Sequence, residues 1–300
     1  MIDQKIIDFF RIDAGEKVKL KKRDTSWAAT DELRQLGKDS IKERAKVILD
    51  ENLKNLAQAQ QRLYADDRHS LLIVLQAMDA AGKDGTIKHV MSGVNPQGCQ
   101  VYSFKQPSAE ELDHSFLWRC QKRVPERGRI GIFNRSYYED VLVVKVHPEL
   151  LEKQKLPPGK RGKSFWQGRY EDINSFEEHL VRNGTIVLKF FLHVSKAEQK
   201  RRFLERLDNP EKNWKFSVAD LAERGYWNDY MRAYEEALEA TSTKWAPWYV
   251  VPADHKWVTR AVVADIVTTS LINLGLQYPV VSDEQHKLLA EARRKLEGEK

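Results

Sequence analysis

Apolar residues gather in five short runs along the chain, each bounded by polar or turn-forming residues. The runs cover residues 71–75, 101–104, 130–133, 186–192 and 248–251. Short runs rich in β-branched and aromatic residues are typical of buried strands. Because helical stretches separate the runs, the pattern predicts an α/β fold with a five-stranded parallel sheet that helices cover on both faces.

Between these runs, apolar residues recur every three to four positions, which is the period of an amphipathic helix. Helices are predicted over residues 31–65, 257–274 and 282–295, and onward from Thr86, Ser108, Phe165 and Ser195. Residues 1–30 show no sustained period, so we expect an irregular N-terminal extension there. No change in composition divides the chain, so residues 1–300 are predicted to form a single domain.

Composition narrows the class of protein. No apolar run approaches the roughly 18 residues that a membrane helix needs, and the N-terminus carries no apolar signal segment. We therefore expect a cytoplasmic protein that does not contact a membrane. Cys99 and Cys120 are expected to be reduced core thiols. A net charge of +6 suits either a polyanionic partner or a solvated basic surface.

The most informative stretch follows the first apolar run. Residues 76–86 read Gln-Ala-Met-Asp-Ala-Ala-Gly-Lys-Asp-Gly-Thr. A loop of small residues between a strand and a helix lets backbone N–H groups surround a phosphate. The match to G-x-x-x-x-G-K-[ST] is imperfect, because Ala77 replaces the first glycine and Asp84 replaces the metal-binding hydroxyl. The candidate phosphate-binding residues of the loop are Ala80, Ala81, Gly82, Asp84, Gly85 and Thr86.

Two charged residues of this loop are candidates for the chemistry. Lys83 opposes the dipole of the helix it begins, which favours a bound anion over a merely solvated side chain. Asp79 either caps the turn or binds Mg²⁺ through a carboxylate oxygen. The metal role is favoured, because phosphate chemistry needs charge neutralisation and the usual Ser/Thr ligand is absent. Asp84 and Gly85 also suit the start of a helix.

Polar residues also follow the third apolar run, and ligands of an open α/β sheet bind at such strand ends. Asn134 is neutral, so it can only ligate a metal weakly or orient water. Arg135 is a candidate clamp for a phosphate group, and a buried ion pair with Glu139 or Asp140 is the alternative. Glu139 and Asp140 are equally consistent with binding a metal, with binding nucleotide hydroxyls and with lying on the solvent-exposed face of a helix.

Cations are dense in the segment that follows the fourth run. Arg202 and Arg206 are four positions apart and share a helix face, whereas Arg201 lies off it. A charged helix is usually just solvated. Because this helix follows a strand whose end faces the predicted phosphate site, residues 200–225 are predicted to form a lid. The candidate lid cations are Arg201, Arg202, Arg206, Lys212 and Lys215.

Six motifs, in their order and spacing, resemble the family-2 polyphosphate kinases. They include residues 76–85, Phe-Asn-Arg-Ser-Tyr-Tyr-Glu at 133–139 and Asn-Trp-Lys-Phe-Ser at 213–217, and the others lie at 95–98, 191–195 and 246–248. The resemblance runs from about residue 17 to 276. It implies a P-loop kinase-like sheet with a helical lid, dependence on Mg²⁺ with Mn²⁺ as an alternative, and assembly as homodimers or homotetramers.

The resemblance also implies roles for single residues. Asp79 matches the loop acid that binds Mg²⁺, Lys83 the phosphate-binding lysine and Arg135 the arginine after the second motif. The basic lid of the family is matched by Arg201, Arg202, Arg206 and Lys215. The chain departs from the pattern at Asn134, where many members carry aspartate, and at Glu139, where the best-known branch carries an amide. It therefore resembles the class III branch, which phosphorylates nucleoside mono- and diphosphates, and Glu139 becomes a candidate contact for the acceptor or its metal.

The function expected is direct in-line phosphoryl transfer between inorganic polyphosphate and AMP, ADP or ATP, without a covalent enzyme intermediate. One alternative is an ATP-dependent kinase of nucleotides or other small molecules, indifferent to polyphosphate. Another is a basic protein that binds nucleic acid or another polyanion beside a vestigial phosphate loop, without turnover. The presence of Asp79 beside Lys83 argues against such a binder, so no nucleic-acid partner is expected.

Overall fold

A six-stranded sheet forms the centre of the protein in the computed structural model, which describes residues 1–28 and 30–299. The strands are β1 (Arg11–Ile12), β2 (Ser70–Gln76), β3 (Cys99–Ser103), β4 (Ile130–Asn134), β5 (Thr185–His193) and β6 (Trp248–Pro252). They lie in the order β1-β6-β5-β2-β4-β3. β2 to β6 are parallel, as the five apolar runs predict, whereas β1 is antiparallel to β6. The sheet is therefore mixed, with one strand more than expected.

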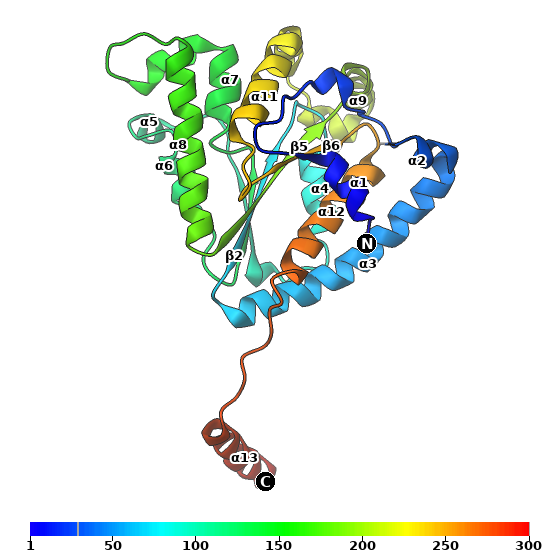
Figure 1. The fold of residues 1–300 in the computed structure, drawn as a ribbon, viewed down its shortest axis with the longest axis vertical. Helices are drawn as coiled ribbons and strands as arrows, with labels where there is room; N and C mark the ends of the chain where they lie inside the picture. The colour runs from blue at the N-terminus through cyan, green and yellow to red at the C-terminus, as the bar shows by residue number, and fades with distance from the viewer. Residues whose placement is uncertain (29, 300) are drawn as a thin grey trace.

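Helices cover both faces of this sheet (Figure 1). They are α1 (Gln4–Phe10), α2 (Asp31–Gln35), α3 (Lys38–Asp66), α4 (Lys83–Val90), α5 (Ala109–Leu112), α6 (Trp118–Gln121), α7 (Glu139–Val146), α8 (Lys163–Arg182), α9 (Lys196–Asp208), α10 (Val218–Glu223), α11 (Trp227–Thr241), α12 (Lys256–Ile272) and α13 (Asp283–Glu297). The 3-10 turns are η1 (Leu20–Lys22), η2 (Pro96–Gly98), η3 (Pro148–Gln154), η4 (Pro210–Lys215) and η5 (Arg224–Tyr226).

The helices form two layers with the sheet between them. α12 packs against α3 and α4 on one face, and α11 packs against α7 and α8 on the other. All seven residues of β2 are buried, because this central strand is covered on both faces and paired with β4 and β5. α13 stands apart from the body at the end of an extended segment (Figure 1). None of the described helices is long and apolar enough to cross a membrane.

Three local expectations are wrong. The described residues of the stretch 1–30 are not irregular throughout, since α1 and β1 form there and bury Phe10 and Ile12 in the core. The helix expected over residues 31–65 is broken at Gly37, whose φ of +79° separates α2 from α3. The helix expected from Ser108 to Lys122 is instead the two short helices α5 and α6. In each case contacts with distant segments or a single backbone angle override the local period.

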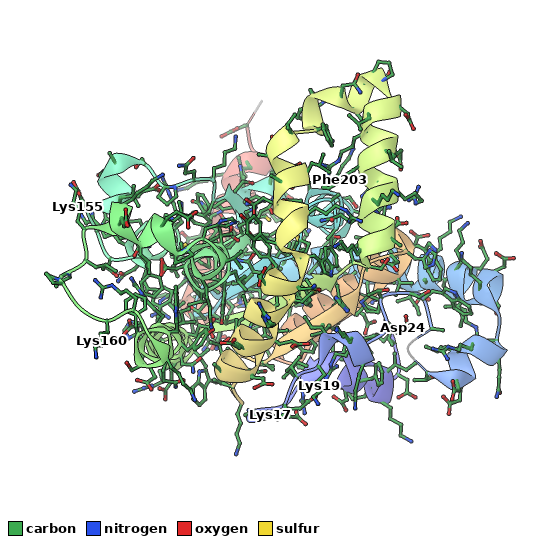
Figure 2. All side chains as sticks on the ribbon, turned by 90° about the horizontal axis from the view of Figure 1, so that it is seen from above. Lys17, Lys19, Asp24, Lys155, Lys160 and Phe203 are labelled. Carbon is green, nitrogen blue, oxygen red and sulfur yellow. The ribbon has the colours of Figure 1, made fainter. Side chains whose placement is uncertain are left out.

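The segment from α9 to η5 rises from the body as a helical arm (Figure 2). We refer to residues 196–226 as the arm. Phe203, labelled in Figure 2, is buried within it and meets Phe216 edge to face, with ring centroids 5.9 Å apart. Ser195 caps the arm, because its side chain accepts a hydrogen bond from the backbone N–H of Glu198. The arm stands over the carboxyl ends of the parallel strands, where the candidate site lies.

Candidate active site

The loop between β2 and α4 turns tightly, and its lysine side chain folds back onto the loop backbone. Ala80 and Gly82 have φ angles of +59° and +110°, and at Gly82 a side chain would be strained in this conformation. Lys83 is the first residue of α4, and its Nζ donates a hydrogen bond back to the carbonyl of Ala77 at 3.0 Å. Burial and the charge of Arg135 lower the pKa of Lys83. The lysine is thereby held across the mouth of the loop.

Arg202 supports this loop from the side of the arm. Its side chain is only 5% exposed, and Nη1 donates to the carbonyls of Ala80 and Ala81 at 2.9 and 2.7 Å. Nη2 donates to the carbonyl of Ala253 at 2.6 Å, and Nε donates to Glu198. Most of its donors are thus engaged by protein groups. Arg202 therefore braces the loop, which differs from the role of a mobile lid cation expected from the sequence.

At the end of β4, Arg135 adopts an unusual backbone angle, with φ of +65°. Its N–H donates to the carbonyl of Leu75 at 3.1 Å, so the turn after β4 is fastened to the end of β2. The guanidinium donates to Asp79 Oδ1 at 2.7 Å and to Glu139 Oε2 at 3.5 Å. The carboxylate of Glu139 raises the pKa of Arg135. Two segments distant in sequence thus meet at one guanidinium.

Asn134 at the end of β4 and Asp84 in the first turn of α4 lie together. Asn134 Nδ2 donates to Asp84 Oδ1 at 2.7 Å, with Ser103 Oγ at 3.4 Å as a weaker second acceptor. Its amide nitrogen is engaged by protein groups, which leaves the amide oxygen as the group that can face a ligand or its water. Thr86 is buried, and its hydroxyl donates a hydrogen bond to the carbonyl of Gly82 at 3.1 Å. The hydroxyl is therefore engaged by the backbone at the start of α4.

Two cavities open on either side of the Asp79–Arg135 pair. The first, which we call the apolar-walled cavity, has a volume of about 510 Å³ and includes Leu112, Phe116, Val143, Val144 and Leu150 in its wall. The second, the basic cavity, has a volume of about 720 Å³ and is lined by residues 79–86 together with Arg206, Lys212, Lys215, Lys256 and Arg260. Residues lining both are Asp79, Lys105, Gln106, Arg135 and Asp220.

The arm supplies cations to the basic cavity, and several of them are partly neutralised. Arg206 lies 3.7 Å from Asp220 and donates to the carbonyl of Lys215, and Lys212 pairs with Glu205. Arg201 is paired with Glu198 and Glu205 and contributes to neither cavity lining. Of the five expected lid cations, Arg206, Lys212 and Lys215 face the open space of the basic cavity, Arg202 braces its loop and Arg201 points elsewhere.

Comparison with known proteins gives the same family as the motifs. The family model described as polyphosphate kinase 2 matches residues 38–275. The chain belongs to the polyphosphate kinase 2 family. It is 52% identical to the ADP-polyphosphate phosphotransferase of Rhodopseudomonas palustris over 288 residues, covering 96% of this chain and 97% of that protein. It is 48% identical to the AMP/ADP-polyphosphate phosphotransferase of Meiothermus ruber, covering 79% and 85% respectively.

The fold comparison agrees with this assignment. The crystal structure of polyphosphate kinase 2 from Arthrobacter aurescens TC1 matches with a TM-score of 0.83 and 39% sequence identity, covering 95% of this chain and 96% of that one. The expected α/β, P-loop kinase-like fold and the family resemblance are therefore confirmed. The described part of the chain holds no group of three or more His, Cys, Asp or Glu side chains placed to bind a metal.

Sequence reasoning missed several residues of this polyphosphate kinase 2 site. Asp220 in the arm lines both cavities, and burial together with the charge of Asp79 raises its pKa. Lys256 and Arg260 lie one turn apart at the start of α12 and line the basic cavity. The rule that ligands bind beyond the carboxyl ends of strands pointed to these two, since α12 follows β6. Nothing local marks Lys105 or Asp220.

Proposed function

We propose that the chain transfers the terminal phosphoryl group of polyphosphate directly to AMP or ADP, across the boundary formed by Asp79, Arg135 and Asp220. The observation that supports this most strongly is the contact of two chemically different cavities at these residues. The names of the Rhodopseudomonas and Meiothermus relatives support the same pair of substrates. Such chemistry depends on positioning and on charge stabilisation, and needs no covalent intermediate.

The basic cavity suits the donor. Polyphosphate is a flexible polyanion, and its charge is matched by Arg206, Lys215 and Lys256, which line this space from the arm and from α12. Gly82 and Lys83 place backbone N–H groups and an ammonium group at the start of α4, where a phosphate binds favourably. We infer that the donor chain lies along this cavity, with its terminal phosphate between Lys83 and Arg135.

The apolar-walled cavity suits the acceptor. Its volume of about 510 Å³ lies within the range of small-molecule sites, and Phe116, Val143 and Leu150 offer an apolar surface to a nucleobase. Arg135 lines both cavities, and Glu139, which lines only this one, contacts it. The cavity therefore has charged groups where it meets the basic cavity. A mononucleotide placed base-inward would direct its phosphate toward the donor phosphate, which is the arrangement that in-line transfer needs.

The carboxylates at the boundary suit Mg²⁺, with Mn²⁺ as an alternative. Magnesium is usually held by one or two carboxylates together with substrate phosphates, and Asp79 and Asp220 are two acids lining both cavities. We infer that Asp79 holds the ion and that Asp220 assists it. When bound, the ion would neutralise charge on the transferred phosphoryl group. Arg135, now paired with Asp79, would then be available to the phosphates.

The acceptor range is proposed to include both AMP and ADP. Glu139 lines the acceptor side and contacts Arg135, and the Meiothermus relative is named for both nucleotides. The arm is proposed to be the lid, about residues 200–225, that closes over the phosphates. The single-domain organisation and the assembly as homodimers or homotetramers stay predictions.

The direct test is incubation of the purified protein with Mg²⁺, AMP and polyphosphate in the absence of ATP, with nucleotides followed by anion-exchange chromatography. Formation of ADP and then ATP is expected. ADP without ATP would restrict the acceptor to the monophosphate. If neither forms, and ADP as acceptor also gives no product, the proposal is wrong and a kinase with ATP as donor becomes the alternative to test.

A further inference from the structure

A glutamine without an assigned role lies directly behind the candidate site. Gln76 is the last residue of β2 and is 0% exposed. It lies outside the linings of both cavities, so it is not placed to touch a substrate. A fully buried side-chain amide at the carboxyl end of a central strand costs free energy unless its donors and acceptors are all engaged. Its partners therefore indicate what it does.

The hydrogen-bonding neighbours of Gln76 orient its amide. With its nitrogen toward Glu139, Nε2 donates to Glu139 Oε1 at 2.9 Å, and Oε1 accepts from the backbone N–H and the hydroxyl of Ser136 at 3.1 and 3.2 Å. The opposite orientation would set the amide oxygen against the carboxylate, acceptor against acceptor. Ser136 is also fully buried, whereas the Glu139 side chain is 17% exposed and lines the apolar-walled cavity, so the network connects the interior to this cavity.

The network fixes both oxygens of one carboxylate. Oε1 of Glu139 is held by Gln76, and Oε2 lies 3.5 Å from Nη1 of Arg135. Arg135 also holds Asp79, and its N–H donates to Leu75, the neighbour of Gln76 in β2. The end of β2 therefore sets the position of Glu139 through a side chain and that of Arg135 through the backbone. Without Gln76, one oxygen of the largely buried Glu139 carboxylate, whose side chain is 17% exposed, would lose its donor.

We propose that Gln76 is a positioning residue that orients the carboxylate of Glu139 and so tunes the affinity for the acceptor nucleotide, leaving the donor site unaffected. This inference rests on the proposed function, which places the acceptor beside Glu139. A glutamine that only stabilised the fold would affect both substrates alike, because the two cavities share the same boundary residues.

The first test is Gln76→Met, which keeps the size of the side chain and removes the donor. We expect the KM for ADP to rise about threefold, within the range for losing one hydrogen bond, with the KM for polyphosphate unchanged. Gln60→Met is the matched control, because Gln60 is also a buried glutamine and lies on α3 outside both cavity linings. This control is expected to change neither KM.

The second test is Gln76→Glu, which places two carboxyl groups against each other. Like charges in a buried site disfavour double ionisation, so the pair would share a proton at low pH and repel at high pH. The kcat/KM for ADP should therefore fall with rising pH relative to wild type, whereas the KM for polyphosphate should not follow. A purely structural role gives no such additional pH dependence.

Equal increases in both KM values for Gln76→Met, or a Gln76→Glu profile parallel to wild type, would overturn the inference. If circular dichroism shows that the Met variant is unfolded, the pH profile of the Glu variant decides the question. A wild-type protein that forms no nucleotide product from polyphosphate would contradict the proposed function, and that result is seen before either variant is made.

Discussion

The two cavities differ in what they offer a ligand, although five residues line both of them, with Asp79, Arg135 and Asp220 among them. The basic cavity presents cations from five separate segments, namely the loop, residue 105, residue 135 after β4, the arm and α12. The apolar-walled cavity presents apolar side chains such as Phe116 and Val143 together with charged residues of both signs, such as Glu111 and Lys153. The first can attract a chain of phosphates of any length by charge, whereas the second is bounded and selects by shape.

The difference predicts where each substitution should be felt. Changes at the shared boundary should affect catalysis with either substrate, whereas changes confined to one cavity should affect one KM. This separation is open to test, because Asp79 and Arg135 lie at the boundary while Lys215 and Glu139 each line only one cavity.

The largest effect is expected for Asp79→Asn. Removing the boundary carboxylate should lower kcat about a thousandfold, comparable to the loss of one preorganised group that stabilises the transition state. Turnover of polyphosphate with AMP should stay low at every Mg²⁺ concentration. Recovery at high Mg²⁺ would show that Asp79 is only a weak ligand, and that Asp220 or the phosphates hold the ion.

Arg135→Ala should be the next most severe change. Its guanidinium joins Asp79 and Glu139, so we expect kcat/KM to fall about a hundredfold with both substrates, through loss of charge stabilisation. Arg135→Lys, which keeps the charge but not the paired donors, is the control and should recover part of the activity. Turnover within a few-fold of wild type in the alanine variant would contradict the clamp role.

The Arg206→Ala, Lys215→Ala double variant tests the basic cavity alone. We expect the KM for polyphosphate to rise about tenfold and its dependence on salt to weaken, because two cations that attract the polyanion are lost. The KM for ADP should equal that of the wild-type protein. Arg201→Ala is the matched control, since Arg201 is a cation of the same arm that faces neither cavity. A similar rise in that control would mean that net charge alone is responsible.

The smallest effect is expected for Glu139→Asn, which changes only the acceptor side. The kcat/KM for AMP should fall several-fold, more than that for ADP. The substitution removes a negative charge beside the acceptor phosphates and shortens the side chain by one methylene group. The KM for polyphosphate should match that of wild type. Equal losses with AMP and ADP would show that Glu139 does not distinguish the two acceptors.

The sequence by itself determined the features that depend on neighbouring residues. The apolar runs predicted β2 to β6, the Ser108 and Ser195 caps are present, and the small-residue loop before Lys83 lies between a strand and a helix. Each of these patterns acts over a few positions, where hydrophobic period, capping and backbone freedom decide the outcome. The convergence of Asp79 and Arg135 also followed, because parallel strands place their carboxyl ends at one edge.

Only the tertiary structure decided which charged groups face a ligand and which support the fold. Arg202 and Arg206 share a helix face in sequence and both line the basic cavity, yet only Arg202 donates to the carbonyls of residues 80, 81 and 253 and so supports the phosphate loop. The bond from Gln76 to Glu139 joins positions far apart in the chain. Such contacts depend on how layers pack in three dimensions, and a linear pattern holds no information about which distant atom will satisfy a buried donor.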